Sequence, residues 1–239
     1  MSMYPLYGFG YYMDWTYILV LIGAVLSIGA SMKVNSTFNK YAKVRSMSGM
    51  TGAQAAAKIL NQAGIYDVRI EHISGNLTDH YDPKSKVLRL SDATYASPSV
   101  AAVGVAAHEC GHALQHNDGY GPLKLRSALV PAANIGSRLG IPIVILGVVL
   151  SYNYTLIQIG IWVFAIAVLF QLITLPVEFN ASGRALAILE GQGILGTTEV
   201  GQCKKVLSAA ALTYVAAAAA SILQLLRLVL LFGGRNDRD

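Results

Sequence analysis

The sequence has few charged residues and almost no cysteine. Asp, Glu, Lys and Arg make up 13% of the 239 residues, whereas soluble domains carry about 25%. Hydrophobic residues account for 54%, so the composition disfavours a soluble protein and indicates a membrane protein. The two cysteines, Cys110 and Cys203, form no framework. Disulfide bonds are therefore not expected to hold the fold, and both thiols are predicted to be packing residues.

Long uninterrupted hydrophobic runs are also few, but four apolar stretches approach the length of about 20 residues that a membrane span needs. Residues 155–177 contain no charged residue and form the clearest candidate. Residues 16–32 are short, residues 132–151 contain Arg138 and Pro142, and residues 206–232 carry Arg227 near their end. No basic residue precedes the first stretch, whereas the acidic Asp14 does. We therefore expect a retained anchor rather than a cleaved signal peptide.

The basic residues predict the orientation in the membrane. The formal net charge is only +5, and the basic residues flank apolar runs instead of forming a stripe, which argues against nucleic-acid binding. Lys33, Lys40, Lys43 and Arg45 follow the first stretch, so residues 33–131 are expected in the cytoplasm. A crossing by residues 206–232 would put two arginines outside, and the sequence leaves three or four spans open.

The segment between the first two stretches predicts a small folded unit. Thr51 begins a helical pattern that ends at a glycine, and residues 68–74 and 86–91 alternate like half-buried strands. The intervening stretch is rich in turn residues, including Asp82-Pro83. Ser97 or Ser99 is expected to cap a helix through residue 116. Its apolar lead, residues 100–107, is too short for a span.

This last helix carries the motif His-Glu-x-x-His. His108 and His112 are four residues apart, so their side chains share one helix face about 5–6 Å apart and can bind one metal ion. Glu109 points off that line and can act as a general base on a metal-bound water. Imidazole ligands with an open position for water suit one Zn²⁺ ion per chain. The alternative to a metal site is that these histidines are packed in the core and have no catalytic or metal-binding role.

The third ligand has several candidates. Asp118 stands where one class of zinc proteases has its third ligand, but Gln115 replaces the glycine that this class needs for its turn. His116 is one turn too far along the helix. Glu178 follows the clearest apolar stretch, where a carboxylate needs a functional reason, and it is favoured as the third ligand.

Several ordered blocks carry a resemblance to a known family. The segments "SPSVAAVGVAAHECGHALQH", "LPVEFNASGRALAIL", "AAALTYVAAA" and "NLTDHYDPKSKVLRLS" resemble the bacterial membrane-bound neutral zinc metallopeptidases of the YugP type. The resemblance implies an endopeptidase in the bacterial cytoplasmic membrane, with zinc held by His108, His112 and Glu178 and with Glu109 as base. It covers nearly the whole chain.

The block around Glu178 also resembles the metal-binding helix of HtpX-type and CAAX-processing membrane proteases. Those proteins have, four residues after the Glu, an Asp that is hydrogen-bonded to a ligand histidine, and this chain has Ser182 there. Asn180 stands where the YugP-type block usually has Asp. Both changes leave open which residues orient the histidines.

Substrate contacts are weaker predictions. Proteases with this motif commonly bind a peptide along an edge strand, and residues 86–91 are predicted to be that strand. A donor near the metal should stabilise the developing oxyanion. The candidates are His80, Tyr81 and Tyr214.

Together these patterns predict a mainly α integral membrane protein with three to four transmembrane helices and a small α+β zincin-like cytoplasmic domain. The expected parts are an anchor (1–32), the cytoplasmic domain (33–131), a transmembrane hairpin (132–177), cytoplasmic helices with the third ligand (178–205) and an Ala-rich membrane-associated helix (206–239).

The leading functional hypothesis is a zinc endopeptidase that cleaves membrane or membrane-near proteins at the cytoplasmic face. Its partners would be a protein or peptide substrate and the lipid bilayer, without nucleic acid; an oligomer or a regulatory membrane partner stays open. A zinc-stabilised adaptor that binds partner helices through residues 209–220 is the non-enzymatic alternative. A site-2-type intramembrane protease is disfavoured because the helix with the motif is too short to span.

Overall fold

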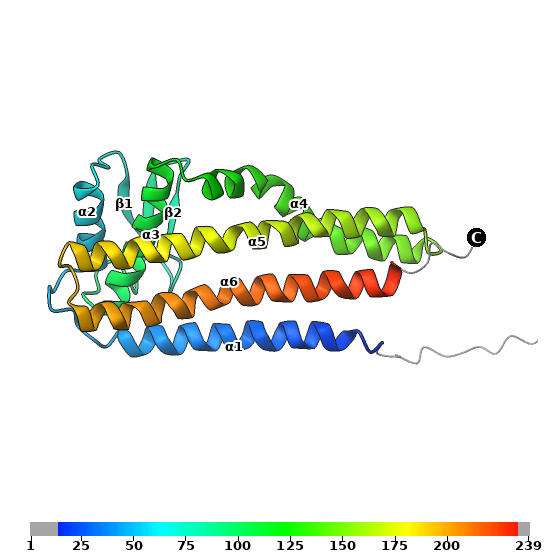
Figure 1. The fold of residues 1–239 in the computed structure, drawn as a ribbon, viewed down its shortest axis with the longest axis horizontal. Coiled ribbons are helices and arrows are strands. Elements are labelled where there is room, and N and C mark those ends of the chain that lie inside the picture. Colours follow the sequence, from blue (N-terminus) through cyan, green and yellow to red (C-terminus); the bar gives the residue numbers. More distant parts are fainter. Residues whose placement is uncertain (1–13, 234–239) are drawn as a thin grey trace, which may run out of the picture.

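The computed structural model describes residues 14–233, in which long helices lie side by side and a small α/β unit occupies one end (Figure 1). The elements are α1 (Tyr17–Tyr41), α2 (Gly52–Gln62), β1 (Arg69–Ile73), β2 (His80–Asp82), β3 (Val87–Ser91), α3 (Val100–Asn117), α4 (Gly121–Val149), α5 (Tyr154–Gly191) and α6 (Thr197–Phe232). The boundaries predicted at residues 32, 177 and 205 fall inside α1, α5 and α6, so these helices continue from the apolar bundle into the α/β end.

Four helices, α1, α4, α5 and α6, are long and apolar enough to cross a membrane. Helix α6 lies along α1 (Figure 1), and a Cβ atom at Gly23 would be 3.1 Å from the Cα atom of Ala220. Closer to the same end of this pair, the guanidinium carbon of Arg227 lies 4.1 Å from the ring centre of Tyr17. The predicted class, a mainly α membrane protein with a small α+β unit, is confirmed.

Helices α4 and α5 form a hairpin in which glycines allow close approach. A Cβ atom at Gly140 would lie 2.7 Å from the Cβ atom of Phe164, and one at Gly160 would lie 2.7 Å from the backbone nitrogen of Val144. Toward its N-terminal end α4 bends away from α5 (Figure 1). Pro131 and Pro142 lie inside α4, and a proline bends a helix because it removes one backbone hydrogen bond.

The sheet has the order β1-β3-β2, with β1 parallel and β2 antiparallel to β3. The helix after Thr51 and the strands near residues 68–74 and 86–91 are confirmed. The prediction that residues 86–91 form an edge strand is wrong, because β3 is the central strand. Its residues Val87, Leu88 and Leu90 are fully buried, as expected of a strand covered on both faces. The two edge strands are β1 and β2. Strand β2 was not predicted, because its three residues lie among turn residues.

Helix α3 packs into the core of the α/β unit. Ser99 caps it, because its hydroxyl oxygen accepts a hydrogen bond of 3.2 Å from the backbone N–H of Ala102. A Cβ atom at Gly111 would lie only 2.6 Å from the backbone oxygen of Ala181 in α5. The two cysteines, Cys110 and Cys203, are free and buried, as predicted. This close packing fixes α3 against the C-terminal half of α5.

Candidate metal centre

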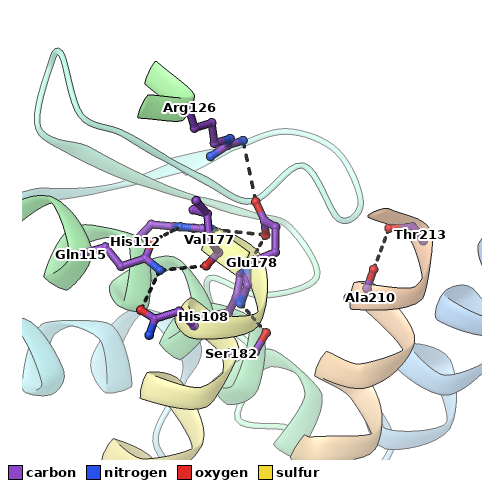
Figure 2. Close-up of polar contacts among 10 residues, drawn as sticks. His108, His112, Gln115, Arg126, Val177, Glu178, Ser182, Ala210 and Thr213 are labelled. Atoms are coloured by element: carbon purple, nitrogen blue, oxygen red, sulfur yellow. Dashed lines mark hydrogen bonds and ion pairs between the residues drawn. The ribbon is translucent and has the colours of Figure 1, made fainter. Parts of the chain in front are cut away.

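The contact between α3 and α5 brings together His108, His112 and Glu178. Their metal-binding atoms all lie within 4.8 Å of one another. One carboxylate oxygen of Glu178, Oε2, is 3.3 Å from Nε2 of His108 and 3.5 Å from Nε2 of His112 (Figure 2). Residues 70 positions apart in the chain therefore converge on a single point.

The other candidates for the third ligand are engaged elsewhere. Asp118 forms an ion pair with Arg184. Nδ1 of His116 lies 2.8 Å from the hydroxyl of Tyr81. Among the alternatives that the sequence leaves open, the geometry favours Glu178.

Each histidine is oriented through its second ring nitrogen. Nδ1 of His108 is 3.1 Å from the hydroxyl oxygen of Ser182, and Nδ1 of His112 is 3.0 Å from Oε1 of Gln115 (Figure 2). An amide oxygen only accepts, so Nδ1 of His112 donates this hydrogen bond. Nε2 is then left with a lone pair for a metal ion, which is how outer hydrogen bonds prepare metal-binding histidines.

Gln115 was missed as a functional residue by the sequence analysis. It is fully buried, and its side-chain N–H groups donate to the backbone oxygen of Val177 at 2.8 Å and to Oδ1 of Asn180 at 3.0 Å. It thus ties His112 to the turn of α5 that carries Glu178. Its position three residues after His112, on the same helix face, was the available signal.

Asn180 and Arg184 extend this network to the surface. The oxygen Oδ1 of Asn180 accepts from Gln115 and also from Nε of Arg184, at 2.9 Å. Of the two polar atoms of the Asn180 side chain, only the oxygen takes part in these hydrogen bonds. Ser182 and Gln115 are the residues that orient the histidines in this chain.

Arg126, in α4, approaches the other oxygen of Glu178. Its Nη2 atom is 3.7 Å from Oε1 of Glu178 (Figure 2), and its Nε atom is buried without a hydrogen-bond partner. The position of Arg126 near Glu178 could not be predicted from sequence spacing, because it depends on the bend of α4. Its positive charge favours the ionised form of Glu178, which a metal ligand requires.

A cavity of about 280 Å³ opens directly onto these residues. Glu109, His112 and Glu178 form part of its wall, and so do all three predicted substrate contacts, His80, Tyr81 and Tyr214. A second cavity, of about 230 Å³, borders His108, Glu109 and Tyr214 from the side of α1 and α6. Glu109 makes no hydrogen bond or ion pair with the rest of residues 14–233, and its carboxylate is available to a molecule in either cavity.

The three predicted oxyanion donors differ in their surroundings. Nδ1 of His80 lies 2.9 Å from the backbone oxygen of Thr78. The Tyr81 hydroxyl contacts His116, and burial, together with the negative charges of Asp67 and Asp82, raises the pKa of Tyr81 to about 12. Of the three, Tyr214 alone borders both cavities. Tyr214 is therefore best placed to face a molecule bound beside Glu109.

The donor set fits zinc. Two imidazole nitrogens and one carboxylate oxygen, with space on the remaining side, match the catalytic zinc sites that keep a fourth position for water. The hydrogen bonds at both Nδ1 atoms leave the Nε2 atoms for the metal.

Comparisons with known proteins agree with this geometry. Residues 16–233 match the family model described as "Putative neutral zinc metallopeptidase". The chain is 50% identical over 224 residues to the "Putative membrane protease YugP" of Bacillus subtilis (strain 168), a match that covers 93% of this chain and 98% of that protein. No solved structure matches the chain. With a match over almost all of the described residues, and with three side chains placed so that they could hold a metal ion, the chain belongs to the family described as "Putative neutral zinc metallopeptidase".

Proposed function

We propose that the protein is a zinc-dependent endopeptidase that cleaves membrane or membrane-near proteins at the cytoplasmic face of a bacterial membrane. The observation that carries this proposal is the convergence of His108, His112 and Glu178 beside a cavity whose wall includes His112, Glu178 and Glu109. A purely structural zinc site would close with four protein ligands and would need no base beside it.

The chain's own residues supply the steps of peptide hydrolysis. A zinc ion held by the three ligands would supply Lewis acidity, lowering the pKa of a coordinated water toward about 7. Glu109 removes the proton from the attacking water and later delivers it to the leaving amine. Tyr214 lies where its hydroxyl can donate to the oxyanion that develops on the scissile carbonyl. Gln115 and Ser182 hold the histidines in orientation throughout.

An extended substrate would pair with β2. This strand is an edge of the sheet, and His80 and Tyr81, two of its three residues, border the cavity with Glu109. Adding a peptide to a free edge gives main-chain hydrogen bonds and places alternate side chains in the cavity. β2 thus takes the role that the sequence assigned to residues 86–91.

The length of α5 supports a position of the centre near the membrane surface. Glu178 lies 24 residues after Tyr154, the first residue of α5, and a helix rises about 1.5 Å per residue, so the two are about 36 Å apart. The hydrocarbon core is about 30 Å thick. This length supports a position of Glu178 just beyond the core, on the side of Lys33, Lys40 and Lys43, which we assign to the cytoplasm.

The test is hydrolysis by the purified full-length protein in liposomes, with a membrane-anchored reporter peptide as substrate. Glu109→Gln should lower kcat by about 10²–10⁴-fold while zinc content stays unchanged, because it removes the base and keeps the ligands. Glu190→Gln is the matched control, since Glu190 is exposed in the last turns of α5. Hydrolysis that survives Glu109→Gln or an excess of 1,10-phenanthroline would refute the proposal.

Part of the surface proposed for the adaptor alternative is buried within the chain. Within residues 209–220, Ala209, Ala211, Ala216 and Ala218 are buried, and Ala220 contacts Gly23 of α1. The small side chains of α6 thus serve packing within the chain. An adaptor would also keep its cellular role in Glu109→Gln, so the same variant separates the two functions.

A further inference from the structure

We propose that a groove between α1 and α6 binds the phosphate group of an anionic phospholipid from the cytoplasmic leaflet. The groove has a volume of about 500 Å³. We call it the lysine groove, and its lining includes Lys33, Thr37, Lys40, Lys204, Lys205 and Ser208. No assigned role of the metal centre involves these residues.

The two helices present their polar residues to the same space. In α1, Lys33, Thr37 and Lys40 recur at intervals of four and three residues, so they share one helix face. In α6, Gly201, Lys204 and Ser208 recur in the same way. Four lysines, Thr37 and Ser208 therefore line one groove. Lysines that only set the orientation in the membrane would not need to gather in this way.

No carboxylate neutralises these lysines. None of the four takes part in an ion pair within residues 14–233, and the groove lining contains no acidic residue. The nearest acid along α6, Glu199, is buried, and its oxygens accept hydrogen bonds from the backbone N–H groups of Met47 and Gly196. The groove therefore has an uncompensated positive charge that calls for an anion from outside the chain.

The depth of the groove selects a lipid over a soluble anion. Lys33 and Lys40 lie 16 and 23 residues after Tyr17, the first residue of α1, which corresponds to about 24 and 35 Å. They bracket the edge of a hydrocarbon core about 30 Å thick. Lys204 and Lys205 lie about 40 Å from the outer end of α6, within the headgroup layer.

The groove also has an apolar end. Leu212 lines it and is 47% exposed, and Val215, one turn closer to the membrane centre, is 39% exposed. An anionic lipid with its phosphate among the lysines and hydroxyls would lay an acyl chain along these residues. Ammonium and hydroxyl groups donate to phosphate oxygens, whereas a choline headgroup would bring a positive charge next to four others.

The experiment is native mass spectrometry of the full-length protein in detergent, titrated with phosphatidylglycerol or with phosphatidylcholine of the same acyl chains. Wild type should retain one phosphatidylglycerol at a concentration at least about tenfold lower than it retains phosphatidylcholine. Lys40→Gln/Lys204→Gln/Lys205→Gln should lose that preference, while Lys33, Lys43 and Arg45 preserve the orientation signal. The matched control, Lys43→Gln/Lys84→Gln/Lys124→Gln, removes the same charge elsewhere and should keep the preference.

A second variant tests the groove without removing a lysine. A Cβ atom at Gly201 would meet no other atom within 4 Å, so Gly201→Glu adds a carboxylate to the groove without crowding, and Gly201→Ala is its neutral partner. Gly201→Glu should abolish the preference and Gly201→Ala should keep it, with zinc content unchanged in both. Equal lipid retention by wild type and the groove variants would overturn the proposal. Equal loss in the control triple, or displacement of the lipid by millimolar glycerol 3-phosphate, would do the same.

Discussion

Both halves of α5 pack closely against a neighbouring helix at glycine residues, but the two contacts have different consequences. In the first half, Gly140 and Gly160 bring α4 and α5 into backbone contact through apolar surfaces. In the second half, Gly111 brings α3 equally close to Ala181, but buried polar residues surround this contact. Close packing assembles the membrane hairpin in one half, whereas in the other it sets the distance between two histidines and a glutamate.

The two halves of α5 should also differ in how strongly a displacement of the helix affects the protein. A shifted apolar contact can repack, and such changes typically cost about 1–3 kcal/mol. At the metal centre, a shift changes ligand distances and breaks the hydrogen bonds of a buried amide, Gln115. The second half should therefore tolerate far less displacement than the first.

The largest effect is expected from Gly111→Val. Its side chain would collide with the backbone of Ala181, where even a Cβ atom would be 2.6 Å from the oxygen, and α5 would carry Glu178 away from α3. Zinc affinity, measured by competition with a fluorescent chelator, should fall by more than about a hundredfold.

Gly140→Val is the counterpart in the membrane half. It should lower the free energy of unfolding by about 1–3 kcal/mol while the folded protein keeps its zinc. Gly183→Ala is the control for both, because a Cβ atom there meets nothing within 4 Å. If Gly140→Val and Gly111→Val weaken zinc binding equally, the distinction between the two halves is wrong.

A smaller effect is expected when Gln115 is replaced by alanine. The change leaves Nδ1 of His112 without its acceptor and removes the link to Val177 and Asn180. Loss of such an outer partner typically costs about 10–100-fold in metal affinity. Ser182→Ala should lie near the lower end of this range, since it removes a single hydrogen bond of 3.1 Å. Zinc titrations of the two variants, run side by side, check this order.

The smallest effect is expected at the surface end of the network. Asp118→Asn breaks the ion pair with Arg184, whose members are 48% and 28% exposed in their side chains, and exposed pairs contribute about 0–1 kcal/mol. Metal analysis should still find one zinc per chain. A variant that loses its zinc would instead make Asp118 a ligand.

The sequence predicted the metal-binding helix because its spacing is local. His108 and His112 meet on one turn of α3 whatever surrounds it, and the caps at Thr51 and Ser99 are equally local. Glu178 could be predicted only by joining the need for a third ligand to an unexplained carboxylate at the end of a span.

Features that depend on tertiary packing escaped the sequence. Strand β2 has three residues and owes its existence to pairing with β3. Arg126 reaches Glu178 because α4 bends. In the sequence, Gln115 was considered only as the residue that replaces the glycine of one class of zinc proteases. Helices α1 and α6, the first and last elements of the fold, form the lysine groove, whereas Lys33 and Lys40 had served in the sequence analysis only to predict orientation.

The most direct test of the account is the zinc content of the detergent-purified protein, wild type beside Glu178→Ala, by inductively coupled plasma mass spectrometry. Glu190→Ala, in the same helix and exposed, is the control. A centre held by His108, His112 and Glu178 should give one zinc per chain in wild type and control, and a loss of zinc in Glu178→Ala. Full retention of zinc in Glu178→Ala would contradict the three-ligand centre, as would wild-type protein without zinc.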